Sequence, residues 1–222
     1  MRKPSIVVAL LVALVAAVPT GAGAWEANHP IFGPGSHPRG ASYTTWVARY
    51  GRYLAEPPVA RSPIAFPSCR NIGTSHGVLL FPVATAAGIV DRCEIPAHTP
   101  LLVSPGGTFR ILGLDAGTRR GVRRLVDRDI ASIHDLSVKI DGHRVHDLGR
   151  FFAGSWTEIE LGNDNLFGAP RGEYRMLIEG WALILHGFRP GAHTIVLSDV
   201  FADSNGNPQV GSITYVLRVE GD

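Results

Sequence analysis

Of all the residues in this sequence, two glutamates on one predicted strand come nearest to the spacing of a catalytic pair. They lie in the stretch WTEIEL, where Glu158 and Glu160 alternate with other residues and share one strand face with Trp156. A glycosidase needs two carboxylates beside an aromatic ring: one donates a proton, one acts as nucleophile or base, and the ring stacks on a sugar. We interpret both glutamates as exposed strand residues, and keep a polysaccharide-acting hydrolase or lyase as the alternative.

No complete catalytic set accompanies this pair. The Glu-x-Asp-x-x-Glu strand pattern of some retaining β-glucanases would need a second glutamate where Gly162 or Asn163 stands. The stretch SPGGTF lacks the lysine and the length of a phosphate-binding loop. The sequence therefore favours a protein that binds rather than reacts, with no cofactor.

Three histidines and three aspartates are concentrated in the stretch HDLSVKIDGHRVHD, residues 134–147. Asp141-Gly142 predicts a two-residue hairpin turn, because both turn positions need positive φ. Pairing around that turn places His143 and His146 on opposite faces, whereas a metal site on one strand needs both rings on one face. The stretch therefore predicts a hairpin, and His146 could still join a site completed by distant residues.

His193 stands in the stretch PGAHTI, which is typical of the entry into a sandwich strand. Glycine supplies the loop, and the β-branched residues that follow supply the strand. The histidine in such a setting usually fixes the loop by hydrogen bonds. We predict that role for His193, and keep ligand binding by His193 or by Trp156 as the alternative.

A loop near the C-terminus resembles the start of a calcium site. Asp203, Asn205 and Asn207 offer oxygen ligands at alternate positions. The pattern is incomplete, because Thr214 stands where an EF-hand loop has its bidentate glutamate. Asn205-Gly206 is equally an ordinary hairpin turn. A calcium-stabilised structural protein is therefore a third functional hypothesis.

The first 24 residues have the pattern of an export signal. Arg2 and Lys3 precede an apolar run over residues 6–18, and Ala22-Gly-Ala24 predicts cleavage after Ala24. The run is shorter than the ~20 residues that span a bilayer, although an uncleaved anchor stays the alternative. Removing the two cations takes the formal charge from +2 to 0. We therefore expect a secreted or periplasmic protein with no nucleic-acid partner and no integral membrane segment after cleavage.

The chain has two cysteines, Cys69 and Cys93. Outside the cytoplasm an even pair is most simply a disulfide, so we predict the Cys69–Cys93 bridge. Two free thiols are the alternative. A metal site is disfavoured, because two cysteines leave two ligands missing at any recognisable spacing.

The remaining pattern predicts an all-β fold, a jelly-roll-like antiparallel β-sandwich with two packed helices. Residues 25–42 are rich in proline and glycine and predict a flexible arm before a single domain over 43–222. Apolar residues at helical spacing predict helices over 43–56 and 115–133. Nine or ten short strands rich in branched and aromatic residues follow Gly77, with glycine or proline between them.

The order of these stretches resembles a family of exported bacterial and archaeal proteins of unknown function. The resemblance runs from about residue 43 to the C-terminus and is carried by PSCRNIG, VLLFPVAT, RCEIPAHTPLLVSP, LSVKIDGHRVHDLGRFFAGS, NLFGAPRGEYRMLIEGWALIL and FRPGAHTIVL. It implies export and a β-rich fold, and it supplies no catalytic residues. The sequence thus leads to one main hypothesis: an exported, non-enzymatic cell-envelope or extracellular module that binds a polysaccharide or an envelope protein.

Overall fold

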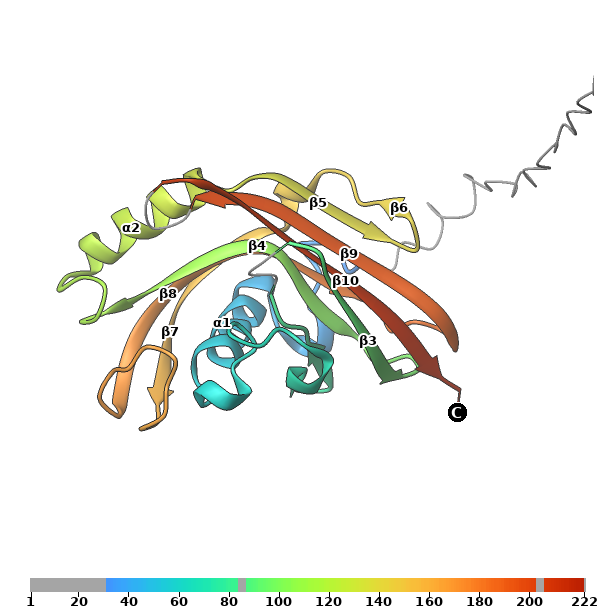
Figure 1. Ribbon diagram of the computed structural model, residues 1–222, viewed down its shortest axis with the longest axis horizontal. Helices are drawn as coiled ribbons and strands as arrows, with labels where there is room; N and C mark the ends of the chain where they lie inside the picture. The colour runs from blue at the N-terminus through green and yellow to red at the C-terminus, as the bar shows by residue number, and fades with distance from the viewer. Residues whose placement is uncertain (1–30, 84–86, 203–205, 222) are drawn as a thin grey trace, which may run out of the picture.

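Two five-stranded sheets packed against each other carry most of the structure (Figure 1). The computed structural model describes residues 31–83, 87–202 and 206–221, so the predicted signal peptide lies outside the described residues. The first sheet has the order β1 (Gly73–Ser75), β2 (Val78–Leu80), β4 (Leu101–Leu112), β8 (Gly172–Leu185) and β7 (Phe152–Leu161). The second has the order β3 (Ile89–Pro96), β10 (Pro208–Glu220), β9 (Gly191–Ala202), β5 (His134–Ile140) and β6 (His143–Arg144). The predicted mainly β sandwich is confirmed.

Both sheets are mixed, which corrects the purely antiparallel arrangement expected from the sequence. β2 runs parallel to β4, and β3 runs parallel to β10. The register of the longer parallel pair places Ile89 beside Ile213. Neither pair is joined by a tight turn, because parallel neighbours need a crossover connection, and a hairpin signal in the sequence cannot reveal such a pair.

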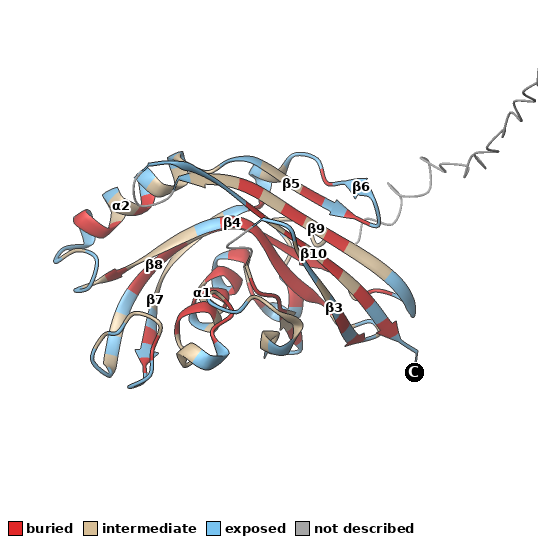
Figure 2. Cartoon of the chain, in the orientation of Figure 1, coloured by how far each residue is buried: buried red, intermediate tan, exposed pale blue. Residues whose placement is uncertain are grey.

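The core lies between the sheets, and the second sheet contributes to it by alternation along its long strands. Buried positions recur every second residue in β9 and β10, as the banding in Figure 2 shows. The hydroxyl of Tyr215 donates to the carbonyl of Pro82 at 2.9 Å, and that of Tyr50 donates to the carbonyl of Phe81 at 2.7 Å. Burial raises the pKa of the Tyr50 hydroxyl well above its ordinary value, so the hydroxyl stays a neutral donor.

Helix α1 (Tyr43–Ala55) lies under the concave face formed by β7 and β8 (Figure 1). Its N-cap is Ser42, whose side chain accepts a hydrogen bond from the Thr45 N–H at 3.2 Å. Trp46, which is fully buried, heads the apolar stripe and donates its Nε1–H to the carbonyl of Pro38 at 2.9 Å. The helix predicted over 43–56 is confirmed.

Helix α2 (Arg119–Ala131) packs against β4 and β8 on the other face of the first sheet. Thr118 caps its start by accepting from the Gly121 N–H at 3.1 Å. Val122 and Val126 form a small separate core with Leu177 of β8. The first sheet is therefore covered by a helix on each face, as the continuous apolar stretch of β8 requires.

The segment from Ile31 to Ser42, which the sequence assigned to a flexible arm, is attached to the domain in the described structure. Ile31 forms a bridge with Leu185, and the Phe32 N–H donates to the carbonyl of Ile184 at 2.8 Å. The Tyr43 hydroxyl donates back to the carbonyl of Phe32 at 2.5 Å. The packed domain therefore begins before Tyr43. Short 3-10 helices complete the chain at Pro38–Gly40, Val59–Arg61, Cys69–Asn71 and Leu148–Phe151.

Cys69 and Cys93 form a disulfide, with their Cα atoms 5.3 Å apart, which confirms the predicted bridge. The bond ties the loop before β1 to the buried face of β3. Within the described ranges, no helix is both long enough and apolar enough to cross a bilayer.

Candidate functional site

The free edge of β4 borders a cavity of about 960 Å³. β2 covers β4 only at Leu101 and Leu102, so from Ser104 onward β4 pairs with β8 alone, apart from a bridge between Leu112 and Ala116 in the described residues. The cavity follows this edge between α1 on one side and the ends of α2 and β9 on the other. An unpaired strand edge therefore forms part of its wall, with backbone donors and acceptors available to a ligand.

Glycines shape this edge of β4. The register with β8 shifts between Val103 and Gly106, which marks a bulge. Gly107 pairs with Gly180, and a Cβ built on Gly180 would lie 2.6 Å from the Gly107 Cα. Only a glycine pair allows the two strands to approach so closely.

The inner wall of the cavity is apolar. The side chains that line it there come from α1, β4, β8 and the loops beside them: Val47, Tyr50, Leu54, Ile64, Phe109, Leu166, Phe167, Ile178 and Ala182. Phe109 and Phe167 meet edge to face, with ring centroids 5.8 Å apart. This wall can hold a hydrocarbon or ring system but offers few hydrogen bonds.

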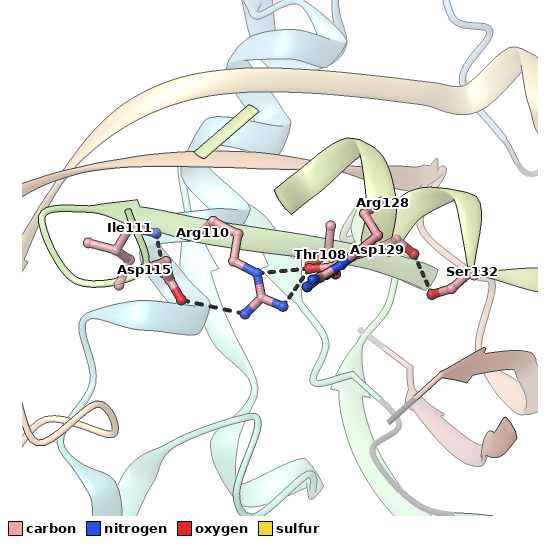
Figure 3. A network of polar contacts seen from close by, with 7 residues as sticks. All are labelled: Thr108, Arg110, Ile111, Asp115, Arg128, Asp129 and Ser132. Carbon is pink, nitrogen blue, oxygen red and sulfur yellow. Dashed lines mark hydrogen bonds and ion pairs between the residues drawn. The ribbon is translucent and has the colours of Figure 1, made fainter. Parts of the chain in front are cut away.

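The outer wall carries a polar network centred on Asp129 of α2 (Figure 3). Arg110 of β4 donates from Nε to Asp129 Oδ2 at 2.8 Å, and its Nη1 lies 3.5 Å from Asp115 Oδ1. Arg128 approaches the other oxygen of Asp129 through Nη2 at 3.0 Å. Two arginines thus balance two aspartates, and the network fastens the end of α2 to β4.

Asp199 of β9 is a further acidic group of the cavity, and it is buried, with 8% of its surface exposed. Asp199 faces inward like Ile195 and Leu197, which precede it at every second position of β9. Ile195 and Leu197 belong to the packed core, whereas Asp199 lines the cavity. Burial raises the pKa of this carboxyl from 3.8 to about 6, although a hydrogen bond from its own backbone N–H opposes the shift. No described cation pairs with it.

The predicted glutamate pair lies outside the cavity. Glu158 and Glu160 are exposed on the outer face of β7, opposite Arg175 and Glu173 of β8. Trp156 shares that face but is covered by α2, whose Arg119 guanidinium lies 5.1 Å from the ring centroid. The three side chains do share one face, as predicted, yet that face carries no described cavity and the ring is already occupied.

His193 has the loop-fixing role expected from its sequence context. Its Nδ1 lies 2.7 Å from Asp141 Oδ2, and its Nε2 lies 3.1 Å from the carbonyl of Arg189. Asp141 also accepts from the Thr194 N–H at 2.7 Å. The histidine thereby ties the β5–β6 turn to the start of β9, and both of its ring nitrogens are engaged.

The hairpin predicted within residues 134–147 is confirmed by the pairing of Ile140 with His143, and His146 is exposed beyond it. Two members of the calcium hypothesis, Asp203 and Asn205, lie outside the described residues, so that hypothesis stays a prediction. The third, Asn207, is exposed.

Among the described residues, one group of potential metal ligands has its ligand atoms close together: Cys69, Asp91 and Cys93. Both sulfurs are consumed in the disulfide, and Asp91 accepts a hydrogen bond from the Cys69 N–H. Because a bridged sulfur is a poor metal ligand, the cluster is explained by the disulfide and its supporting hydrogen bond.

Asp199 and the Asp129 network were not singled out from the sequence. A signal for Asp199 was present: in the stretch TIVLSDVF an aspartate falls at an inward-facing position of an alternating strand. The Asp129 network had no such signal, since its two arginines and two aspartates come from β4, the following turn and α2, and only the fold brings them together.

Comparisons with protein-family models, with curated proteins and with solved structures find no match to this chain. The resemblance to a family of exported proteins therefore stays a prediction, and the cavity is the feature of this chain that bears on its function.

Proposed function

We propose that this protein is an exported, non-enzymatic binding module that holds an apolar or amphipathic small molecule in the cavity along β4. One observation carries the proposal: a cavity of about 960 Å³ with an apolar inner wall and a few polar groups concentrated at its outer side. Binding sites for small molecules are concave, mostly apolar and in the range of ~300–1,000 Å³. The wall is built from packed helices and strands, so the site is preformed.

A polysaccharide ligand, or hydrolysis of one, has weaker support. Sugar recognition needs an accessible ring and many hydrogen-bonding partners, whereas Trp156 is covered by Arg119 and the cavity wall is mainly apolar. Glu158 and Glu160 do not line the cavity. Their replacement by glutamine is expected to leave ligand binding unchanged.

Export fits this proposal in two ways. A disulfide is typical of proteins outside the cytoplasm. The first 24 residues have the charge and hydropathy pattern of a cleaved signal. A module outside the cytoplasm that encloses an apolar molecule would carry or sequester that molecule in water.

The test uses N-phenyl-1-naphthylamine, a neutral apolar dye whose fluorescence rises when it leaves water. The purified protein is titrated with the dye, which is excited directly. We expect saturable binding by one site per chain. An Ile133→Trp variant, which fills the cavity from the end of α2, is expected to bind several-fold more weakly.

The matched control is Val90→Trp, which adds the same indole to a residue that is 62% exposed on β3 and outside the cavity. This variant should bind the dye like the wild type. Absence of saturable binding, or equal weakening by both variants, would contradict the proposal.

A further inference from the structure

We infer that the cavity selects a cationic amphiphile, a molecule with a protonated amine on an apolar body, and that Asp199 is the residue that pairs with the amine. This inference deepens the proposed function and rests on it. It assigns a ligand class to the cavity. It also assigns a recognition role to Asp199, a side chain that takes no part in the disulfide, in the apolar core or in the Asp129 network.

The first support is the isolation of Asp199. The carboxylate is buried in a wall of the cavity, and its one hydrogen-bond donor in the described structure is its own backbone N–H. Its neighbour across the ladder in β10 is Gly211, which brings no side chain. A buried carboxylate without a cation is costly, so a ligand that supplies a cation gains free energy from a site already in place.

The second support is the charge balance of the remaining wall. Arg110 and Arg128 balance Asp115 and Asp129, and Arg123 reaches from α2 to pair with Glu179. Among the charged side chains that line the described cavity, Asp199 alone has no ion-pair partner. Counted over the described residues, the cavity wall therefore carries one uncompensated negative charge when Asp199 is ionised.

The same balance disfavours an anionic ligand. The cation best placed to meet one is Arg110, but its Nε and Nη2 contact Asp129, and its Nη1 faces Asp115. Arg128 is also held by Asp129. A carboxylate or phosphate would have to displace these partners, and would add repulsion from Asp199.

The third support is the combination of the charge with an apolar wall. The inner side chains of the cavity, which run from α1 to Phe109 and Phe167, can bury a chain or ring that water would expel. Burial of the apolar body supplies most of the binding free energy, and Asp199 supplies the selection, because hydrocarbon contacts alone do not distinguish an amine from an alcohol.

The test compares three probes with one chain length and different head groups: dodecan-1-amine, dodecan-1-ol and dodecanoate. Each competes with N-phenyl-1-naphthylamine for the purified protein at about pH 8, where the amine is charged and Asp199 is ionised. The amine should bind about tenfold or more tightly than the alcohol, and dodecanoate most weakly.

Asp199→Asn removes the charge with little change of shape and should bring the amine to the affinity of the alcohol, with alcohol binding unchanged. Asp135→Asn is the matched control, because Asp135 is 78% exposed and outside the cavity. It should preserve the preference for the amine.

The outcomes separate the two proposals. If no probe and no dye binds, the proposed function itself fails. If all three probes bind with equal affinity, or if the preference for the amine survives Asp199→Asn, the cavity binds apolar molecules and the assignment of a cationic ligand to Asp199 is wrong.

Discussion

The carboxylate of Asp199 lies directly against Gly106 of the opposite sheet. A Cβ built on Gly106 would be 3.2 Å from Asp199 Oδ2 and 2.7 Å from the Cδ2 of Leu136. The glycine thus makes the space in which the carboxylate of β9 can approach the edge of β4. The cavity and its acidic group depend on this pair, one residue from each sheet.

Gly106→Ala is expected to destabilise the protein by about 1–3 kcal/mol, because the new methyl group overlaps the side chain of Leu136 and crowds Asp199. Urea unfolding followed by tryptophan fluorescence measures the change. Gly117→Ala is the control, because a Cβ there meets nothing within 4 Å. Equal midpoints for the two variants would show that the two sheets do not meet closely at Gly106.

The charge of Asp199 should make stability fall as the pH rises. Burial raises the pKa of Asp199 from 3.8 to about 6, so between these values the unfolded chain loses the proton and the folded chain keeps it. The contribution of Asp199 therefore favours folding below about pH 4 and is lost as the pH rises through about 6. His134 is the nearest histidine along the ladder: it lies on β5, pairs with Val200 of β9, and is 59% exposed beside Asp135.

Asp199→Asn isolates this contribution. The variant should be more stable than the wild type by about 1–2 kcal/mol at pH 8, after allowance for solvent screening, and about equally stable at pH 4. Urea unfolding at the two pH values measures the difference, and His134→Gln, which changes a neighbouring exposed side chain, is the control. A variant that is less stable than the wild type at pH 8 would mean that the carboxylate has a cation partner.

Much of the fold could be predicted because its signals are local. The helices have apolar stripes and capping hydroxyls, the β5–β6 hairpin has its Asp141-Gly142 turn, and the cysteines have one possible pairing. The two parallel strand pairs could not be predicted from local patterns. β3 and β10 are separated in sequence by most of the domain, and no local pattern in either strand identifies its partner.

The site was harder to predict for the same reason. Glu158, Glu160 and Trp156 drew attention because they are neighbours in sequence, yet none of them lines the cavity along β4. The groups that do share a cavity, Asp199 and Arg110, come from opposite sheets. Only the packing of those sheets shows that one is isolated and the other is paired.

The network of Figure 3 should anchor the end of α2. Arg110→Met removes the guanidinium between Asp115 and Asp129 but keeps an apolar stem. The resulting loss of stability therefore measures the contribution of the polar contacts. We expect the free energy of unfolding to fall by about 1–3 kcal/mol, because Asp129 is only 18% exposed and would keep only Arg128 and a 3.4 Å hydrogen bond from the Thr108 hydroxyl.

Amide hydrogen exchange locates this effect. The amides of α2 should exchange faster in Arg110→Met, while those of α1 change little. Arg124→Met is the control, since Arg124 is exposed on the outer side of the same helix and has no ion-pair partner in the described structure. If both variants exchange alike, α2 is held by Val122 and Val126 and the network adds nothing to its attachment.

The disulfide should contribute about 3 kcal/mol to the free energy of unfolding, because it closes a loop across a sequence separation of 24 residues. A Cys69→Ala, Cys93→Ala double variant is expected to unfold at a correspondingly lower urea concentration, with a somewhat steeper slope in denaturant, because the unfolded chain is less compact without the bridge. Dithiothreitol should destabilise the wild type by a similar amount and leave the double variant unaffected. If dithiothreitol shifts the double variant as well, its effect does not come from the bridge, and a wild type that it leaves unshifted would argue that the two thiols are free in the purified protein.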